Sequence, residues 1–167
     1  QRFPPAPQIL GPILEGIRYE SEDTPIDQMF SELLSRAADS ARVNEAHPAF
    51  PLLIRQLSAD EARILKSLGS ASYAYTDSMD YNAATHVFSN HTILKDELPR
   101  SGLQFPENVN FYIEHLDQLG LAQLIGVGNQ KPLFADASSP HLQTGVERHF
   151  SYQLTEVGRR FLTACMP

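Results

Sequence analysis

Apolar residues recur at helical spacing through the first part of the chain. The clearest stripe follows Thr24, which can cap a helix that has Pro25 at its first position and Asp27 near its free amide groups. Its apolar face consists of Ile26, Met29, Phe30, Leu33, Leu34, Ala37 and Ala41. A weaker stripe covers residues 9–17, and another follows His47-Pro48 up to Leu57. The pattern predicts a proline-rich linker and a helical N-terminal part over residues 1–57.

A second part, residues 58–167, begins with a capping box in which Ser58 faces forward and Glu61 reaches back. This helix is expected to stop near Gly69. The elements predicted after it are a short hairpin within residues 70–104, a helix at 106–119, a strand at 121–125, a flexible loop at 126–145, a strand at 149–154 and a last helix from Thr155.

The order of these elements is that of a winged helix-turn-helix module. We therefore predict a mainly α fold with a small β component (α+β), in which N-terminal helices pack on a winged helix-turn-helix-like domain at residues 58–167. With 167 residues, both parts are expected to form one compact unit.

Composition indicates a cytoplasmic protein. Hydrophobic residues make up 42% and charged residues 20% of the chain, and no apolar run approaches the roughly 20 residues that span a bilayer. Cys165 is the single cysteine, so no internal disulfide can form, and the start of the chain has no secretory signal. Because the sequence starts at Gln1 with a proline-rich stretch, we expect a further segment to precede it.

Charge argues against nucleic acid as the partner. The net charge is −7, and the helix predicted at residues 107–119 contains no Lys or Arg. Its outward positions are Glu107, Asn110, Glu114, Asp117 and Gln118. Carboxylates at these positions would be repelled by a polyanion. The alternative, a DNA-binding winged-helix regulator, would have to use Lys131, Arg148 and the N-terminal arm.

Candidate catalytic and metal-binding patterns are incomplete. His86 and His91 are five residues apart, a spacing that places them on no common ligand face, and Gly126-Val127-Gly128 lacks the context of a phosphate loop. Cys165 lies on an apolar stripe, as a small core residue would. We therefore expect no enzyme, metal, cofactor or small-molecule ligand. A nuclease would require a pocket that gathers Glu15, a histidine and further carboxylates.

Two groups of residues are candidates for protein interaction. Glu15, Arg18 and Tyr19 combine charge with an aromatic ring, which fits either a packing contact or a binding surface. The second group is the outward face of the helix at residues 107–119, with Asn110, Glu114 and Asp117. The expected partner is another protein or a second copy of the chain.

Several separated motifs resemble the Abi-alpha family of bacterial domains of unknown function. They are Gly11-Pro12-Ile13-Leu14-Glu15-Gly16-Ile17-Arg18-Tyr19, Met29-Phe30-Ser31-Glu32-Leu33-Leu34, His47-Pro48-Ala49-Phe50, Gln56-Leu57-Ser58-Ala59-Asp60-Glu61-Ala62, residues 116–121 and Leu154-Thr155-Glu156-Val157-Gly158. The resemblance implies a bacterial cytoplasmic protein linked to abortive infection, the sacrifice of phage-infected cells. It brings no catalytic residues, and residues 126–145 depart from the family pattern. The resulting hypothesis is a regulatory or protein-interaction domain.

Overall fold

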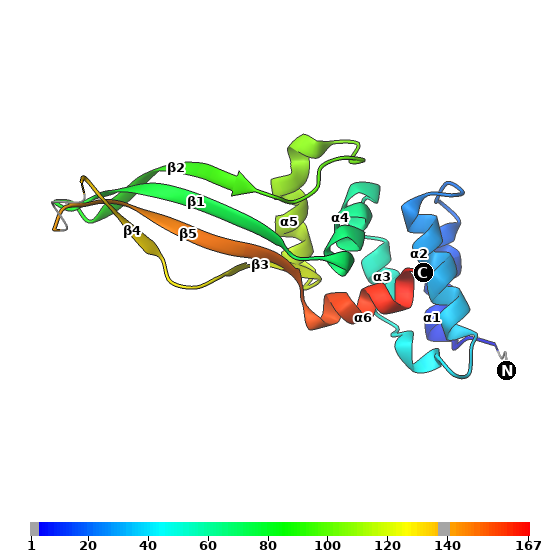
Figure 1. Cartoon of the computed structure of the whole chain (residues 1–167). Coiled ribbons are helices and arrows are strands. Elements are labelled where there is room, and N and C mark those ends of the chain that lie inside the picture. Colours follow the sequence, from blue (N-terminus) through cyan, green and yellow to red (C-terminus); the bar gives the residue numbers. More distant parts are fainter. Residues whose placement is uncertain (1–3, 137–140) are drawn as a thin grey trace. The chain divides into compact units, whose positions relative to one another are not determined.

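A computed structural model describes residues 4–136 and 141–167, which form two compact units (Figure 1). The helical unit contains residues 1–70, 100–123 and 154–167, and the sheet unit contains residues 71–99 and 124–153. Residues 1–3 of the predicted proline-rich linker and residues 137–140 of the predicted loop lie outside the described residues.

The helical unit confirms the helices that the sequence predicts. Its elements are α1 (Pro7–Ile17), α2 (Pro25–Ala37), the 3-10 helix η1 (Val43–Glu45), α3 (Phe50–Ile54), α4 (Ala59–Ser70), the 3-10 helix η2 (Pro106–Asn108), α5 (Val109–Gln118) and α6 (Glu156–Cys165). The predicted caps are also present: the backbone amides of Asp27 and Gly158 donate to the hydroxyls of Thr24 and Thr155, at 3.1 and 2.8 Å.

The core of this unit forms around α2, which packs against α1, α3, α4 and α6. Phe30 and Leu33 are fully buried on its inner face. Close packing requires glycine at two positions. A Cβ on Gly16 would lie 2.3 Å from Cζ of Phe30, and a Cβ on Gly158 would lie even closer to the carbonyl oxygen of Leu121. Glycine therefore allows α1 to approach α2, and the start of α6 to approach the backbone after α5.

The sheet unit contains five antiparallel strands: β1 (Tyr73–Asn82), β2 (Val87–Asp96), β3 (Ala122–Gly126), β4 (Lys131–Phe134) and β5 (Gln143–Leu154). Their order is β2-β1-β5-β3, with β4 also pairing with β5. The central pair, β1 and β5, runs in register from Tyr73 opposite Tyr152 to Asp80 opposite Gly145. One edge of the sheet is therefore the ten-residue strand β2, which Figure 1 shows alongside β1.

The predicted winged helix-turn-helix is wrong. Residues 70–104 contain two ten-residue strands, β1 and β2, rather than a short hairpin between helices. The first of these strands pairs along β5, so the two strands expected to form a wing belong to a five-stranded sheet. The fold is α+β with a large sheet. The pairing that creates it joins residues about 70 positions apart, and a local pattern carries no information about such a contact.

Candidate functional site

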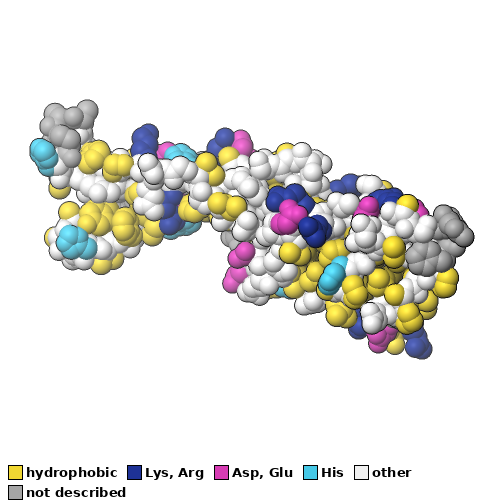
Figure 2. Space-filling model, turned by 90° about the horizontal axis from the view of Figure 1, so that it is seen from below, with side chains coloured by type: hydrophobic (Ala, Val, Ile, Leu, Met, Phe, Trp, Pro, Cys, Tyr) yellow, Lys and Arg dark blue, Asp and Glu magenta, His cyan; other side chains and the backbone are white. Residues whose placement is uncertain are grey.

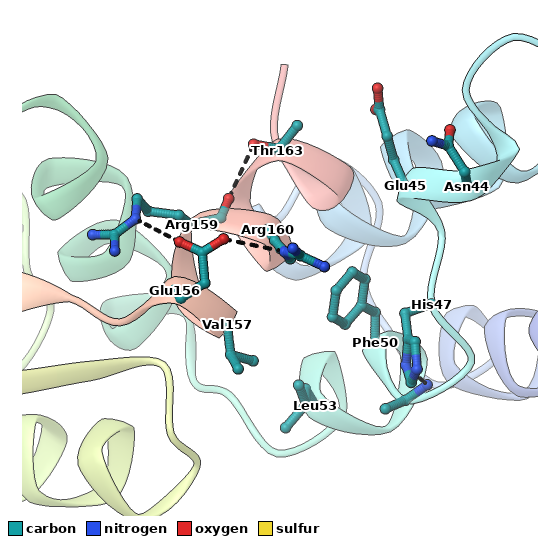
Figure 3. Close-up of a pocket in the computed structure, with 11 residues that line it drawn as sticks. Asn44, Glu45, His47, Phe50, Leu53, Glu156, Val157, Arg159, Arg160 and Thr163 are labelled. Atoms are coloured by element: carbon teal, nitrogen blue, oxygen red, sulfur yellow. Dashed lines mark hydrogen bonds and ion pairs between the residues drawn. The ribbon is translucent and has the colours of Figure 1, made fainter.

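The helical unit contains a hollow of about 720 Å³ between η1, α3 and α6 (Figure 3). Its lining residues are Asn44, Glu45, His47, Ala49, Phe50, Leu53, Glu156, Val157, Arg159, Arg160 and Thr163. The floor is apolar, with the ring of Phe50 held edge-on against Phe161 at 5.4 Å between centroids. Its volume lies within the range of about 300–1,000 Å³ that is typical of small-ligand pockets.

The charged groups of the hollow largely neutralise one another. The Glu156 carboxylate accepts hydrogen bonds from Nε of Arg160 at 3.2 Å and Nε of Arg159 at 3.3 Å, as Figure 3 shows. Hydrogen bonds from Arg160 and then Arg159 hold the pKa of Glu156 below its ordinary value. The only hydroxyl of the lining belongs to Thr163, which donates to the backbone carbonyl of Arg159 at 3.0 Å. These contacts assemble no nucleophile and base.

Two adjacent buried carboxylates, Asp60 and Glu61, link α4 to α5 and to the segment that precedes it. Asp60 accepts the backbone amides of Gln104 and Phe105, both at 2.8 Å, and Nη1 of Arg63 at 2.8 Å. Burial alone would raise the pKa of Asp60, but these hydrogen bonds outweigh burial and lower it. Glu61 accepts the Ser58 amide at 2.7 Å, which confirms the capping box.

The second carboxylate also reaches α5. The Oε1 atom of Glu61 lies 2.5 Å from Nδ1 of His115, whose ring stacks on Phe111. Because the other oxygen of Glu61 is held by both the amide and the hydroxyl of Ser58, the group is a structural link between two helices. We assign it no chemical role.

A third buried carboxylate, Asp77, lies in the sheet unit on β1. Its two oxygens accept Nε and Nη2 of Arg148 on β5 at 2.8 and 2.6 Å, and Nε2 of His91 on β2 lies 2.8 Å away. Burial would raise the pKa of Asp77, whereas the hydrogen bonds from Arg148 and His91 lower it. The cluster ties three strands together and fixes their register.

The sheet unit carries most of the exposed large apolar side chains. Nine of the fifteen found among the described residues belong to it, although it has only 59 of the 167 residues. They are Val87, Phe88, Ile93, Leu94, Leu124, Ile125, Val127, Phe134 and Leu142. Figure 2 shows hydrophobic side chains at the surface on the left as well as on the right of this face. Four of the nine lie on β2, at one edge of the sheet, whereas Leu124 and Ile125 lie on β3, beyond β1 and β5.

The two edges of the sheet differ in how readily they can pair with another strand. On one side, β3 and β4 are short, and β4 begins with Lys131-Pro132, features that hinder further strand pairing. On the other side, β2 has ten residues without proline, and residues 81–94 contain no Lys, Arg, Asp or Glu. Sequence reasoning missed this edge, although the uncharged stretch was visible.

The two groups of residues predicted to bind protein lie on different helices. Glu15, Arg18 and Tyr19 belong to α1 and the turn after it, and α1 packs against α2 and α3. Glu15 pairs with Arg55 at 3.2 Å, and the guanidinium of Arg18 lies over the Tyr19 ring, which is 78% exposed. The tyrosine ring is thus available at the surface rather than packed on a neighbouring helix.

The second group, Asn110, Glu114 and Asp117, lies on α5, which packs against α4. All three side chains are exposed, as the helical pattern predicts. However, α5 is not the recognition helix of a winged module, because the fold contains a five-stranded sheet in place of a wing. The binding role of both groups stays a prediction.

The two cations proposed to contact DNA lie on opposite faces of the sheet. Lys131 on β4 is opposite Glu147, and Arg148 is the next residue along β5. Since consecutive strand residues point to opposite faces, Lys131 and Arg148 do not converge. Two donors of Arg148 are already bound to Asp77.

Within residues 4–136 and 141–167, no group of three or more His, Cys, Asp and Glu side chains is arranged to hold a metal ion. Over the same residues, every helix is too short or too polar to cross a bilayer.

Comparison with known proteins places the chain in a family. The family model described as Abortive infection alpha matches residues 1–165. The chain belongs to the Abortive infection alpha family. The structure of an uncharacterized protein from the hydrocarbon-degrading marine bacterium Alcanivorax borkumensis SK2 is 16% identical, with a TM-score of 0.43 over 75% of this chain and 96% of that one. No curated protein matches the sequence.

The motifs that resemble the Abortive infection alpha family all lie in the helical unit, within residues 1–70, 100–123 and 154–167. Several of their residues have a packing role in the structure. Gly16 makes room for Phe30, Ser58 and Glu61 form the capping box, and Gly158 adjoins the Leu121 carbonyl. These motif residues therefore contribute to the packing of the helical unit.

Proposed function

We propose that this member of the Abortive infection alpha family is a protein-interaction domain and that its interaction surface is the β2 edge of the sheet unit. The family supplies the biological setting, which is abortive infection. The observation that carries the proposal is the edge strand β2, in which four exposed large apolar side chains lie within an uncharged stretch, residues 81–94.

Strand pairing is the recognition mode that suits such an edge. An exposed edge strand presents unpaired amides and carbonyls to an incoming strand, and the neighbouring side chains supply specificity. In β2 the exposed apolar side chains are Val87, Phe88, Ile93 and Leu94. They would leave water when a second strand covers the edge, which stabilises the complex through the hydrophobic effect.

Photo-crosslinking tests the proposal. We would place benzoylphenylalanine at Phe88 of β2, at Tyr19 after α1 and at Phe111 of α5, and irradiate bacterial cells that express the chain with and without phage. The two comparison positions are the more exposed, 78% and 64% against 45% for Phe88. A lack of adducts at positions 19 and 111 would therefore not result from poor accessibility of these positions to a partner.

We expect covalent adducts from position 88 and few from positions 19 and 111. Adducts only from positions 19 or 111 would instead support the surfaces predicted from the sequence and overturn the proposal. A lack of adducts at all three positions would contradict the interaction function itself.

A further inference from the structure

The exposed edge strand β2 has a symmetric order of apolar and polar residues. Val87 and Phe88 form an apolar pair at one end, Ile93 and Leu94 form another towards the other end, and residues 89–92 between them are polar. Read in either direction, the segment 87–94 gives the same order. An antiparallel copy of the same segment would therefore place apolar residues opposite apolar residues and polar residues opposite polar ones.

The faces of the sheet agree with this symmetry because of an irregularity in the middle of β2. Two residues opposite each other across a two-fold axis normal to a sheet must lie on the same face. In a regular strand Phe88 and Ile93, five positions apart, would lie on opposite faces. Between Ser78 and Asp80 the register shifts, because β2 advances three residues, from Thr92 to Ser89, while β1 advances two. The extra residue of β2 brings Phe88 and Ile93 onto the same face of the sheet.

The observed partners on β1 confirm this change of phase. Phe88 is opposite Tyr81 and Ile93 is opposite Asp77, and these β1 residues, four positions apart, share a face. On the other face, Ser89 and Thr92 are opposite Asp80 and Ser78, two positions apart. The centre of the irregularity is Asn90, whose φ of 52° is in the left-handed region.

From this geometry we infer that the occupant of the β2 edge is the β2 strand of a second copy of this chain, paired antiparallel about a two-fold axis near Asn90 and His91. In the resulting dimer Phe88 of one copy lies opposite Ile93 of the other, and Ser89 lies opposite Thr92. Pairing rests on two flanks, residues 88–89 and 92–93, because Leu94 lies at a second register shift and is opposite no residue of β1. It joins two five-stranded sheets into one of ten strands. The inference rests on the proposed function and names the partner at the same edge.

Charge also favours a second copy at this site. A chain with net charge −7 repels its own copies over most of its surface. Residues 81–94 carry no Lys, Arg, Asp or Glu, so the paired flanks bring no like charges together. The first charged side chain beyond them, Lys95, is compensated by Glu97 at 2.7 Å.

The oligomeric state of matched variants tests the inference. Ile93→Lys places a charge opposite Phe88 of the other copy, whereas Val127→Lys changes a residue of the same unit that is equally exposed, 49% in both cases. By light scattering at high micromolar concentration we expect twice the mass of one chain for the wild type and for Val127→Lys. Because the symmetry places the lysine at two sites in each dimer, we expect Ile93→Lys to weaken association about a hundredfold.

Mixed disulfides test the register. One chain carries Ser89→Cys and another carries Thr92→Cys, and the native Cys165 is buried and does not compete. Opposite residues of antiparallel strands have Cα atoms about 4.5–5.5 Å apart, within the span of a disulfide. Under mild oxidation the mixture should give a covalent heterodimer, while neither chain alone should give a comparable homodimer.

Failure of the inference is distinguishable from failure of the proposed function. A wild-type chain that stays monomeric at high concentration, or a mixture that forms no heterodimer, overturns self-pairing. If position 88 then crosslinks to a different protein, the interaction function through β2 stands. If association persists in Ile93→Lys, the contact lies elsewhere and the assignment of β2 is wrong.

Discussion

Replacing Asp60 by Asn should destabilise the helical unit by about 2–3 kcal/mol. The Asp60 carboxylate accepts two backbone amides at 2.8 Å and the guanidinium of Arg63 at 2.8 Å. A hydrogen bond to a charged group contributes about 1.5–3 kcal/mol, and asparagine keeps one acceptor oxygen while turning an NH₂ group towards a backbone amide. One of the two amide hydrogen bonds is lost, and the other two hydrogen bonds, from the second amide and from Arg63, become weaker because their acceptor is neutral.

The difference in the free energy of unfolding between the wild type and Asp60→Asn should become smaller at acidic pH. The pKa of Asp60 in the folded chain is lower than its ordinary value of 3.8. Its contribution is therefore fully present above the unfolded pKa and is lost as the pH falls through the folded pKa. The other carboxylates titrate in both proteins, so they largely cancel in the difference.

Urea unfolding followed by circular dichroism, at neutral pH and at steps down to strongly acidic pH, measures this difference. Asp117→Asn is the control, because it removes an exposed carboxylate from α5 without buried contacts. We expect the free energy of unfolding of Asp60→Asn to be lower than that of the wild type by a constant amount near neutral pH, and this difference to become smaller below about pH 3.8. A difference below about 0.5 kcal/mol at neutral pH, which is within the range of ordinary surface substitutions, would show that the hydrogen bonds of Asp60 do not stabilise the helical unit.

Three further predictions follow from close contacts and burial. Gly158→Ala should destabilise the chain by about 3 kcal/mol or more, since the added Cβ would overlap the carbonyl of Leu121. In the control Gly11→Ala the added Cβ meets nothing within 4 Å, so this variant should be neutral or stabilised. Thermal melting of both variants checks this, and equal melting temperatures would contradict it. Arg148→Met should cost about 3 kcal/mol in urea unfolding, because it leaves a buried carboxylate without its bidentate partner; an unchanged midpoint would show that the ion pair does not stabilise the sheet. Burial raises the pKa of Cys165, so a thiol reagent should modify this residue at the rate of unfolding and faster only in denaturant; rapid modification of the native chain would disprove its burial.

The helical unit was predictable because its signals are local. A cap such as Thr24 and the Ser58–Glu61 capping box act over three residues, and both form the expected hydrogen bonds. The apolar stripe of α2 likewise identifies its buried face. Propensity, capping and periodicity agree in these segments, so the sequence alone identified the helices.

The sheet unit was not predictable in the same way. The partner of β1 is β5, about 70 residues later, and nothing near Tyr73 specifies Tyr152 as the residue opposite. The irregularity at Asn90 also breaks the alternation by which a ten-residue strand would be recognised. Without knowledge of that sheet, the order of elements matches that of a winged helix.

The periodicity of the sequence predicted the exposure of one candidate group of residues but gave no indication of the β2 edge. Periodicity correctly placed the side chains of Asn110, Glu114 and Asp117 on the outside of α5. It could not indicate the β2 edge, because exposure of Phe88 and Ile93 depends on how many strands cover them. The absence of charge from residues 81–94 was the one signal available in the sequence.

Hydrogen exchange of the purified chain, measured by mass spectrometry in dilute and in concentrated solution, compares the two candidate surfaces directly. Pairing of β2 with a second strand slows exchange of its outward amides. If β2 pairs with a second copy, we expect exchange in residues 87–94 to become slower as concentration rises, while exchange in α5 stays unchanged. Slower exchange in α5 at high concentration, with residues 87–94 unaffected, would contradict it.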